Sequence, residues 1–295
     1  MIGDSPTESH PAVPTRSAGV AVVTGAARGI GAATVQGLAA AGWSVVAVDR
    51  GSDDPRLPYA LGSETELLRV VEVARVSART WSTQETGTTE ERDPDRVIAY
   101  LADVSDEAAL GAAVAMAEQR FGGLDAMVAV AGVIAGGVPL WEMPAAELAS
   151  VLEVDLGGVI AAARVGIPAM LRRSVPRRGR FLAVASAAAT RGLPQLAAYG
   201  AAKAGVAGLI RGLAAELGDT GITANAVSPG STGTVMLDES ARLYGLDGAE
   251  MFASQQPVGR LLAPEEVAAV LVWLAGPSSS AMTGAVIPVD GGLSL

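Results

Sequence analysis

The sequence predicts a single α/β domain built on a doubly wound sheet of about seven parallel strands flanked by helices. Short valine-rich apolar runs alternate with longer alanine-rich segments, as strands and helices do in a parallel sheet. The chain has 295 residues and 50% hydrophobic content, which suffices for one large core. We therefore expect one domain over residues 19–295, preceded by a disordered leader over residues 1–18.

Seven short apolar runs are the expected strands. Each has the length and the β-branched content of a buried parallel strand. The longer segments between them have the composition of helices. The expected strands lie near residues 20–24, 44–48, 97–101, 126–130, 180–185, 222–228 and 285–289.

The connection between the second and third strands is about twice as long as one helix and one strand require. We expect an insertion within residues 50–95, with residues 51–62 ahead of an amphipathic helix of roughly 64–79. The polar acidic stretch 82–95 is expected to be flexible. Residues 51–62 leave the sheet at the end of the second strand, so they either fold over a ligand there or decorate the surface without a role.

A glycine turn follows the first strand and precedes a helical stretch. It reads Gly25-Ala-Ala-Arg28-Gly29-Ile30-Gly31. Glycines allow a tight turn and a close approach of phosphate to the backbone, and a helix N-terminus offers free N–H groups to an anion. Strand, glycine turn and helix together predict a nucleotide site, although a glycine triplet alone is a weak signal.

Asp49 ends the second strand, about 24 residues after the first glycine of the turn. A carboxylate at this distance accepts hydrogen bonds from a ribose diol and repels a 2′-phosphate, which favours NAD over NADP. Arg28 and Arg50 lie close by in the sequence. Each either reaches a phosphate or is simply solvated, so the preference for NAD depends mainly on Asp49.

Lys203 is the only lysine of the chain, and it follows Tyr199 by one helical turn. A compact ammonium on this face would lower the pKa of the phenol, which the planar, spread charge of arginine does less well. Ser186 follows an apolar strand at the end where parallel sheets place their ligands. The three side chains are therefore candidates for acid–base chemistry at one site, although each alone is common on helices and in turns.

These motifs together resemble those of the short-chain dehydrogenase/reductase family. The resemblance runs from about Gly19 to the C-terminus and implies a Rossmann-type nucleotide-binding fold and hydride transfer between an alcohol and NAD. It implies that Ser186, Tyr199 and Lys203 are catalytic. The cofactor-binding positions that it implies are Gly25, Arg28, Gly29, Ile30, Gly31, Asp49, Asp103, Val104, Ala131, Gly132, Tyr199, Lys203, Pro229, Gly230 and Thr234.

One position departs from the family pattern. The family commonly has asparagine in a Val-Asn-Leu sequence that completes a proton path to the lysine, where this chain has Val154-Asp155-Leu156. An ionised Asp155 would keep Lys203 protonated but oppose phenolate formation at Tyr199, whereas a protonated one could donate and accept as the amide does. Asp155 is thus a fourth catalytic candidate, or merely bonds the backbone.

The segments that flank the site in this fold carry apolar side chains, and we see no arginine there that would clamp a carboxylate or phosphate. A hydrophobic secondary alcohol or its ketone is therefore the expected substrate. The same residues could instead be ordinary core or subunit interface. They are Val133, Ile134, Leu193, Leu196, Met236, Leu237, Tyr244, Met251 and Phe252.

The insertion and several loops are similar to the mycofactocin-coupled branch of the same family, through residues 54–61, 130–136, 185–194 and 228–231. This resemblance implies that NAD stays bound and that its electrons pass to the redox carrier mycofactocin. The family resemblance also implies a homotetramer, assembled through helices near 147–172 and 198–217 and the C-terminal residues 291–295.

Two other functions remain open. One is an ordinary member of the family with an exchangeable cofactor, such as a 3-oxoacyl-thioester reductase that uses NADPH. The other is a catalytically idle nicotinamide-binding regulatory protein. Asp49 argues against the first, and the intact set of Ser186, Tyr199 and Lys203 argues against the second.

Composition excludes several classes of site and partner. The chain has no cysteine and one histidine, His10 in the leader, so disulfides, thiolate metal sites and histidine catalysis are ruled out, and no acidic cluster suggests a metal. A net charge of −10 argues against nucleic acid and anionic membranes. The longest uncharged stretch, 267–289, is broken by Gly276-Pro277, and the leader has no apolar core of a signal peptide. We expect a cytoplasmic protein.

Overall fold

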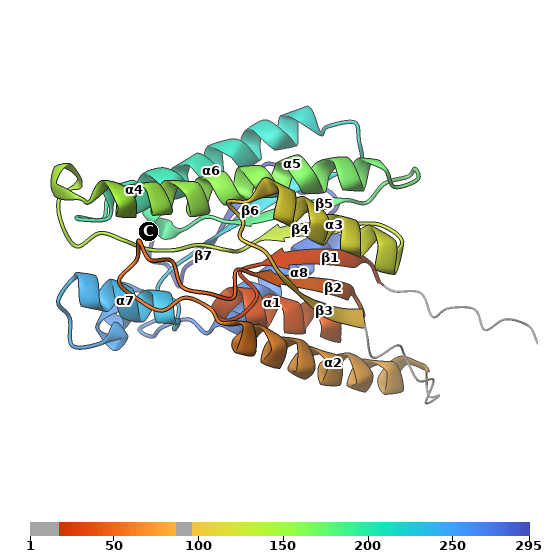
Figure 1. Cartoon of the computed structure of the whole chain (residues 1–295), viewed down its shortest axis with the longest axis horizontal. Helices are drawn as coiled ribbons and strands as arrows, with labels where there is room; N and C mark the ends of the chain where they lie inside the picture. Colours follow the sequence, from red (N-terminus) through yellow and green to blue (C-terminus); the bar gives the residue numbers. More distant parts are fainter. Residues whose placement is uncertain (1–17, 87–95) are drawn as a thin grey trace, which may run out of the picture.

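Seven parallel strands form one sheet in the order β3-β2-β1-β4-β5-β6-β7 (Figure 1). The computed structural model describes residues 18–86 and 96–295. The predicted fold class is confirmed, and every predicted strand is present within about two residues of its expected bounds. The strands are β1 Val20–Thr24, β2 Ser44–Asp49, β3 Val97–Leu101, β4 Ala126–Ala129, β5 Arg180–Val184, β6 Thr223–Pro229 and β7 Val286–Val289.

Helices cover both faces of the sheet (Figure 1). One face packs against α1 (Gly29–Ala40), α2 (Glu64–Thr86) and α8 (Pro264–Ala275). The other packs against α3 (Glu107–Phe121), α5 (Gly158–Leu171) and α6 (Ala197–Glu216). The remaining helical elements are α4 Ala145–Leu152, α7 Val235–Leu243 and the short turns η2 Leu140–Glu142, η3 Glu153–Gly157, η4 Ala187–Ala189, η5 Ala249–Gln255 and η6 Pro277–Ser279.

The strands read as unbroken apolar runs because both of their faces are buried. In β1, Val22 packs in the cluster on the α3, α5 and α6 side, whereas Val23 packs in the cluster on the α1, α2 and α8 side. Both side chains have no exposed surface. A strand covered by helices on both faces has no reason to alternate apolar with polar residues.

The helix that follows residues 51–62 is longer than the sequence predicts. It begins at Glu64 as expected, but α2 continues to Thr86 instead of ending near residue 79. Residues 82–86 are therefore helical and not part of a flexible stretch, because an established helix adds each further residue at little cost. The rest of the stretch predicted to be flexible, 87–95, and the leader up to residue 17 lie outside the described residues.

Helices α4 and α5 are joined through η3 into one helical segment, Ala145–Leu171, that is long and apolar enough to cross a membrane. More than half of its most apolar window is buried inside the protein. Its α5 part packs on β4 and α3. The segment therefore has the surroundings of a core helix, for which an apolar composition is ordinary.

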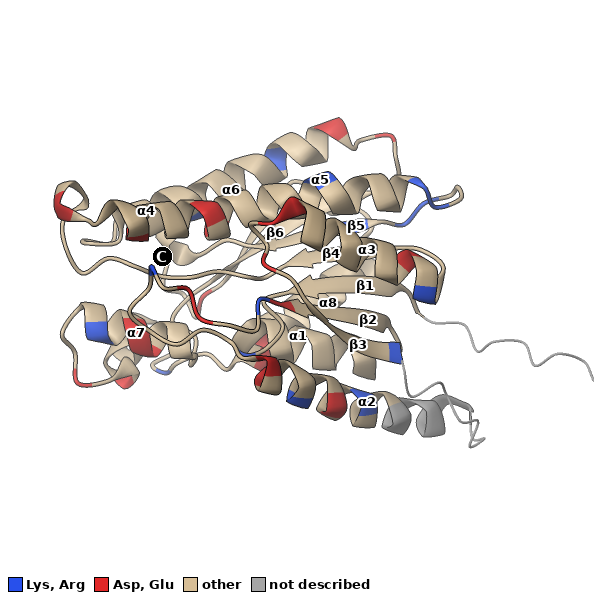
Figure 2. Cartoon of the chain, in the orientation of Figure 1, with Lys and Arg blue, Asp and Glu red and all other residues tan. Residues whose placement is uncertain are grey.

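Residues 51–62 pass from the end of β2 across the carboxyl edge of the sheet before they reach α2, and we call them the strap (Figure 1). Figure 2 shows both acidic and basic residues along this loop. Leu57 of the strap is 8% exposed and belongs to an apolar cluster with Val133, Ile134 and Val154, on the far side of the cavity from β2. The strap is thus packed into the domain.

Candidate active site

The carboxyl ends of the strands and the strap enclose a cavity of about 670 Å³. All fifteen positions that the family resemblance assigns to the cofactor line this cavity, from Gly25 in the glycine turn to Thr234 at the start of α7, and so does Ser186. Asp155 is fully buried and lies beside Lys203 without lining the cavity. The fold therefore brings the predicted residues together from the ends of six strands, β1 to β6.

The glycine turn leaves room and free donors for a phosphate. A Cβ at Gly31 would lie 1.9 Å from the carbonyl oxygen of Gly25, so only glycine permits this contact. Helix α1 begins after Arg28 with no side chain capping its N-terminus. The N–H groups of its first turn therefore face the cavity as donors, in the arrangement that binds pyrophosphate.

Asp49 is held in place by the backbone. Its carboxylate accepts hydrogen bonds from the N–H groups of Ala27 (3.0 Å) and Gly51 (3.1 Å). A Cβ at Gly62 would lie 3.0 Å from Oδ1 of Asp49, so the strap closes directly onto this carboxylate. The position suits the diol of an adenosine ribose and repels a phosphate there.

The two arginines that could have favoured NADP are engaged elsewhere. Arg28 donates to the carbonyl oxygen of Ala60 in the strap at 2.7 Å. Arg50 lies 3.0 Å from Asp54 and 3.4 Å from Asp103. Because their charges are committed to the strap and to a carboxylate pair, the site has the character of an NAD site.

Ser186 and Tyr199 reach the same end of the cavity from β5 and α6. Ser186 follows β5 in extended conformation, and its hydroxyl caps η4 by accepting from Ala188 N–H at 3.1 Å. Tyr199 and Lys203 lie one turn apart on α6, as predicted, with Nζ of Lys203 5.6 Å from the centre of the phenol ring. Nζ also donates to the carbonyl oxygen of Val184 at 3.2 Å.

Asp155 lies in η3, a π-helical turn between α4 and α5. Such turns inside α-helices are frequent at functional sites. Oδ1 of Asp155 lies 2.9 Å from Nζ of Lys203 as an ion pair, without the angles of a hydrogen bond, and Oδ2 accepts a long hydrogen bond (3.4 Å) from Val133 N–H.

Burial and mutual charge shift all three ionisable groups. Burial raises the pKa of Asp155 above its usual range, although the Lys203 ammonium opposes the shift. Burial also raises the pKa of Tyr199; Lys203 and a hydrogen bond with Ser186 lower it, while Asp155 adds to the rise. Burial alone would lower the pKa of Lys203, but Asp155 and Tyr199 outweigh it and raise the pKa above its ordinary value.

The substrate half of the cavity is lined by apolar side chains, as expected, except that one predicted residue does not line it. Eight of the nine predicted lining residues border it, but Met251 does not and is 55% exposed. Met251 sits on the outer side of η5, where Phe252 turns inward instead. Arg191 also borders the cavity, but it donates to the carbonyl oxygen of Leu293 at 2.7 Å, so the expectation that no arginine clamps an anion there stays a prediction.

Sequence reasoning missed the strap residues that line the cavity, Tyr59, Leu61 and Gly62. The hydroxyl of Tyr59 accepts from Ile134 N–H at 2.9 Å, and burial raises the pKa of this phenol, so it remains neutral. The available signal was an aromatic residue in a proline-containing loop beside the ribose acid. This signal did not reveal which side of the cavity the ring of Tyr59 would line.

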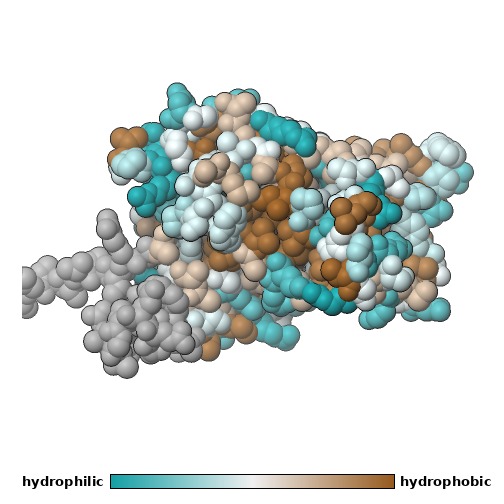
Figure 3. Space-filling view, turned by 180° about the vertical axis from the view of Figure 1, so that it is seen from behind, coloured by the Kyte–Doolittle hydropathy of each residue, from teal (hydrophilic) through white to brown (hydrophobic). Residues whose placement is uncertain are grey.

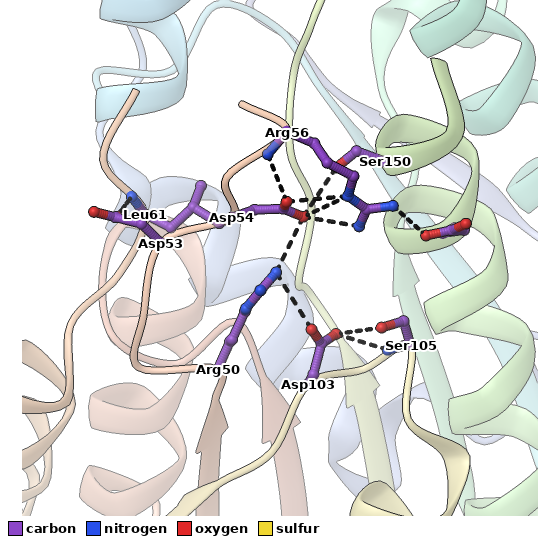
Figure 4. Close-up of polar contacts among 9 residues, drawn as sticks. Arg50, Asp53, Asp54, Arg56, Leu61, Asp103, Ser105 and Ser150 are labelled. Carbon is purple, nitrogen blue, oxygen red and sulfur yellow. Dashed lines mark hydrogen bonds and ion pairs between the residues drawn. The ribbon is translucent and has the colours of Figure 1, made fainter. Parts of the chain in front are cut away.

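Asp54 ties the strap to the end of β2 and to α4 (Figure 4). Its carboxylate is 2% exposed and accepts from Arg56 through the backbone N–H and the guanidinium, at 2.8 to 3.2 Å. Arg50 donates to it at 3.0 Å and the Ser150 hydroxyl of α4 at 3.3 Å. Arg56 extends the network to Glu153 at 2.5 Å. The hydrogen bonds and charge of Arg56 hold the pKa of Asp54 well below its usual range, despite the burial. We call these residues the latch.

A doubly wound sheet with an anion-binding glycine turn, a ribose carboxylate and a Ser, Tyr and Lys set at one cavity defines a nucleotide-dependent oxidoreductase. Comparison with known proteins agrees. Residues 69–294 match the model of the family Enoyl-(Acyl carrier protein) reductase, and residues 19–73 match that of short chain dehydrogenase. The chain belongs to the short-chain dehydrogenase/reductase family and is an oxidoreductase acting on CH–OH donors.

Individual relatives cover nearly the whole chain. Short-chain reductase protein NovJ of Streptomyces niveus is 36% identical over 98% of both chains. Cis-4-hydroxycyclohexanecarboxylate dehydrogenase of Sinomonas cyclohexanicum is 37% identical over 92% of this chain and 95% of its own. The crystal structure of carveol dehydrogenase from Mycobacterium avium in complex with NAD has a TM-score of 0.83 at 28% identity, over 94% of this chain and 98% of that one. The geometry at Asp49 and this NAD-bound neighbour agree on NAD as the cofactor.

Proposed function

We propose that the protein interconverts a hydrophobic secondary alcohol and its ketone, with an NAD that stays bound beneath the strap and passes its electrons to mycofactocin. The observation that carries the proposal is the latched strap, which lies over the ribose carboxylate Asp49 and lines the same cavity as Tyr199. The apolar substrate half and the ketone and alcohol substrates in the names of relatives support the substrate class.

The chain's own residues supply the acid–base chemistry. Tyr199, as phenolate, takes the proton of the alcohol hydroxyl, and Ser186 donates a hydrogen bond to the same oxygen. NAD supplies the acceptor for the hydride that leaves the carbinol carbon. Lowering the pKa of a phenol from about 10 by two or three units takes roughly 3 to 4 kcal/mol, and the ammonium of Lys203 provides much of it. Lys203 would also hold the nicotinamide ribose.

The strap supports retention of the cofactor. The latch joins it to the end of β2 at Arg50, which also pairs with Asp103 of the β3–α3 loop, and to α4 and η3 at Ser150 and Glu153. Release of NAD therefore requires these contacts to break together. Each 1.4 kcal/mol of opening cost slows release about tenfold. A cofactor released slowly is a poor diffusible oxidant, so a second electron carrier has to regenerate it.

The proposed assembly is a cytoplasmic homotetramer. In the single chain, several apolar side chains on helices are partly exposed. They include Leu152 and Ile160 (39% each) and Trp273 of α8 (47%). Figure 3 shows hydrophobic side chains gathered near the centre of one face. Light scattering at micromolar concentration should give four chains per particle, and a monomer would contradict the assembly.

The experiment that tests cofactor retention begins with the protein as isolated. Mass spectrometry after denaturation should find NAD(H), and added isotope-labelled NAD should exchange slowly. Steady-state turnover with NAD⁺ and an alcohol such as carveol should be low, and an artificial electron acceptor should raise it. Replacing residues 52–61 by a short glycine linker should restore exchange. If the protein is isolated without cofactor and turns over rapidly with NAD⁺ alone, cofactor retention is wrong and the protein is an ordinary member of the family with an exchangeable cofactor.

A further inference from the structure

A fully buried carboxylate lies against the only lysine of the chain. Oδ1 of Asp155 is 2.9 Å from Nζ of Lys203. A Cβ at Gly132 would come within 2.6 Å of this oxygen and 3.3 Å of Nζ, so the pair lies directly beneath the backbone of Gly132, which lines the cavity. Asp155 has no exposed surface and Lys203 is 3% exposed, so their charges act on Tyr199 mainly through the protein.

Two opposite charges consequently bear on Tyr199. The ammonium of Lys203 favours the phenolate, whereas the carboxylate of Asp155 opposes it. The same carboxylate favours the charged form of Lys203 against burial. An amide at this position would keep the shape but leave the lysine as the single formal charge beside Tyr199.

We propose that Asp155 is a positioning residue that fixes the charge of Lys203 and thereby sets the pH at which Tyr199 begins to act as a base. The carboxylate holds the ammonium beneath the phenol and at the same time offsets part of its field. Alcohol oxidation is consequently tuned to a higher pH than asparagine at the same position would give. The kinetic part of this inference rests on the proposed oxidation by Tyr199, but the charge coupling does not.

The groups that face Asp155 come from three elements. Lys203 and Tyr199 face it from α6, and Tyr59 faces it from the strap. From the segment after β4, Val133 contributes an uncharged N–H. Tyr59 stays neutral because burial raises its pKa, so it adds no charge of its own at working pH. The field at Tyr199 is therefore set by Asp155 and Lys203.

The single lysine makes the charge of Lys203 directly measurable. Protein labelled with ¹⁵N-lysine carries one side-chain signal, and its chemical shift reports protonation without substrate or turnover. In the wild type we expect the ammonium to persist at pH 10.4, about where an ordinary lysine is half deprotonated. A midpoint at or below that value, in protein whose circular dichroism shows it folded, would overturn the proposal.

Asp155→Asn provides the second measurement. We expect its lysine midpoint to fall by about one pH unit or more. The chain has four tyrosines, so tyrosinate absorbance compared with Tyr199→Phe reports Tyr199, whose midpoint should fall as well. Glu216→Gln is the matched control, because Glu216 is an exposed carboxylate on the same helix α6. An equal lysine midpoint in Asp155→Asn and the wild type would overturn the proposal.

The pH profile of kcat/KM for oxidation then separates charge from shape. In Asp155→Asn, the rise of kcat/KM with pH should shift by about one pH unit to lower pH. Well below the wild-type midpoint, this variant should therefore be about tenfold faster than the wild type. Asp155→Ala should lose the positioning and be slower at every pH. An unshifted limb or a shift to higher pH would overturn the inference. If the lysine and tyrosine midpoints move as expected but no alcohol is oxidised at any pH, the proposed function fails and the charge coupling stands.

Discussion

Two aspartates are buried near the same cavity, and their pKa values shift in opposite directions. Asp54 of the strap and Asp155 of η3 are 2% and 0% exposed. The pKa of Asp54 is lowered and that of Asp155 is raised. Asp54 accepts from two arginines, a serine hydroxyl and a backbone N–H, whereas Asp155 meets one ammonium and one distant N–H.

The number of donors decides this difference. Burial penalises the charge of both carboxylates, and only a full set of hydrogen bonds and charges repays it. The lowered pKa keeps Asp54 charged at neutral pH, and we propose that this charge holds segments together. The charge of Asp155 is incompletely compensated, so it remains coupled to the protons of Lys203 and Tyr199. We therefore propose that one region holds the strap closed and that the other responds to pH.

The largest expected effect lies on the Asp155 side. Tyr199→Phe removes the ionisable oxygen while keeping the ring, so alcohol oxidation should fall by about 10²- to 10⁴-fold, with NAD binding and the melting temperature retained. Stopped-flow absorbance of NADH formation in single turnover measures it. Activity within about tenfold of the wild type, a barrier change of only ~1.4 kcal/mol, would rule out the role of Tyr199.

Lys203→Arg should fail for a related reason. The longer planar guanidinium cannot keep the contacts of Nζ with both Asp155 and the Val184 carbonyl in the space under Gly132. We expect a loss of roughly 10²-fold or more in the same single-turnover assay. Retained activity would show that a positive charge alone is enough and that the compact ammonium is not required.

The next effect lies on the Asp54 side. Asp54→Asn leaves Arg50 and Arg56 without their shared carboxylate, so the strap should open more readily and NAD should leave about tenfold to a hundredfold faster. Release is followed by chasing labelled NAD with unlabelled NAD. Glu118→Gln breaks another arginine pair, Arg172 with Glu118 on α5 and α3, and should leave release unchanged. Equal release rates in the two variants would show that the latch does not hold the strap.

Asp49→Ala should have a smaller effect on cofactor choice. Removing the carboxylate should weaken the binding of NAD and reduce the discrimination against NADP by about tenfold. NADP should still bind no better than NAD, because Arg28 and Arg50 remain engaged with the strap and its acids. Titration of both cofactors into stripped protein measures this. A wild type that binds NADP at least as tightly as NAD would show that the arginines dominate the site.

The smallest expected effect is that of pH on cofactor release. A carboxylate with a lowered pKa contributes stability above its unfolded pKa and loses it as the pH falls through its folded pKa. Asp54 should therefore hold the strap equally between pH 8 and 5, and release should accelerate only below about pH 4. Oxidation, in contrast, should vary over the neutral to alkaline range. If the rate of NAD release has the same pH dependence as oxidation, the two aspartates do not act independently and this comparison is wrong.

Particular residues show how far the sequence reached. The strand β1 and its glycine turn were predictable because a continuous apolar run and an obligatory glycine depend on local chemistry alone. Tyr199 and Lys203 were predictable because one helical turn fixes their common face. Arg28 and Arg50 were left open between phosphate contact and solvation, since Ala60 and Asp103 lie far along the chain and only the folded strap brings Asp54 to Arg50.

By itself the sequence determined the doubly wound sheet and the nucleotide turn, because these follow from short-range periodicity and residue type, and its resemblance to a family identified the candidate acid–base side chains. The tertiary structure decided how charges are paired. It placed Asp54 between arginines of the strap and Ser150 of α4, and it turned Asp155 onto Lys203 through a π-helical turn. Local sequence cannot supply these pairings, since they depend on packing between distant segments and on how much water the packing excludes.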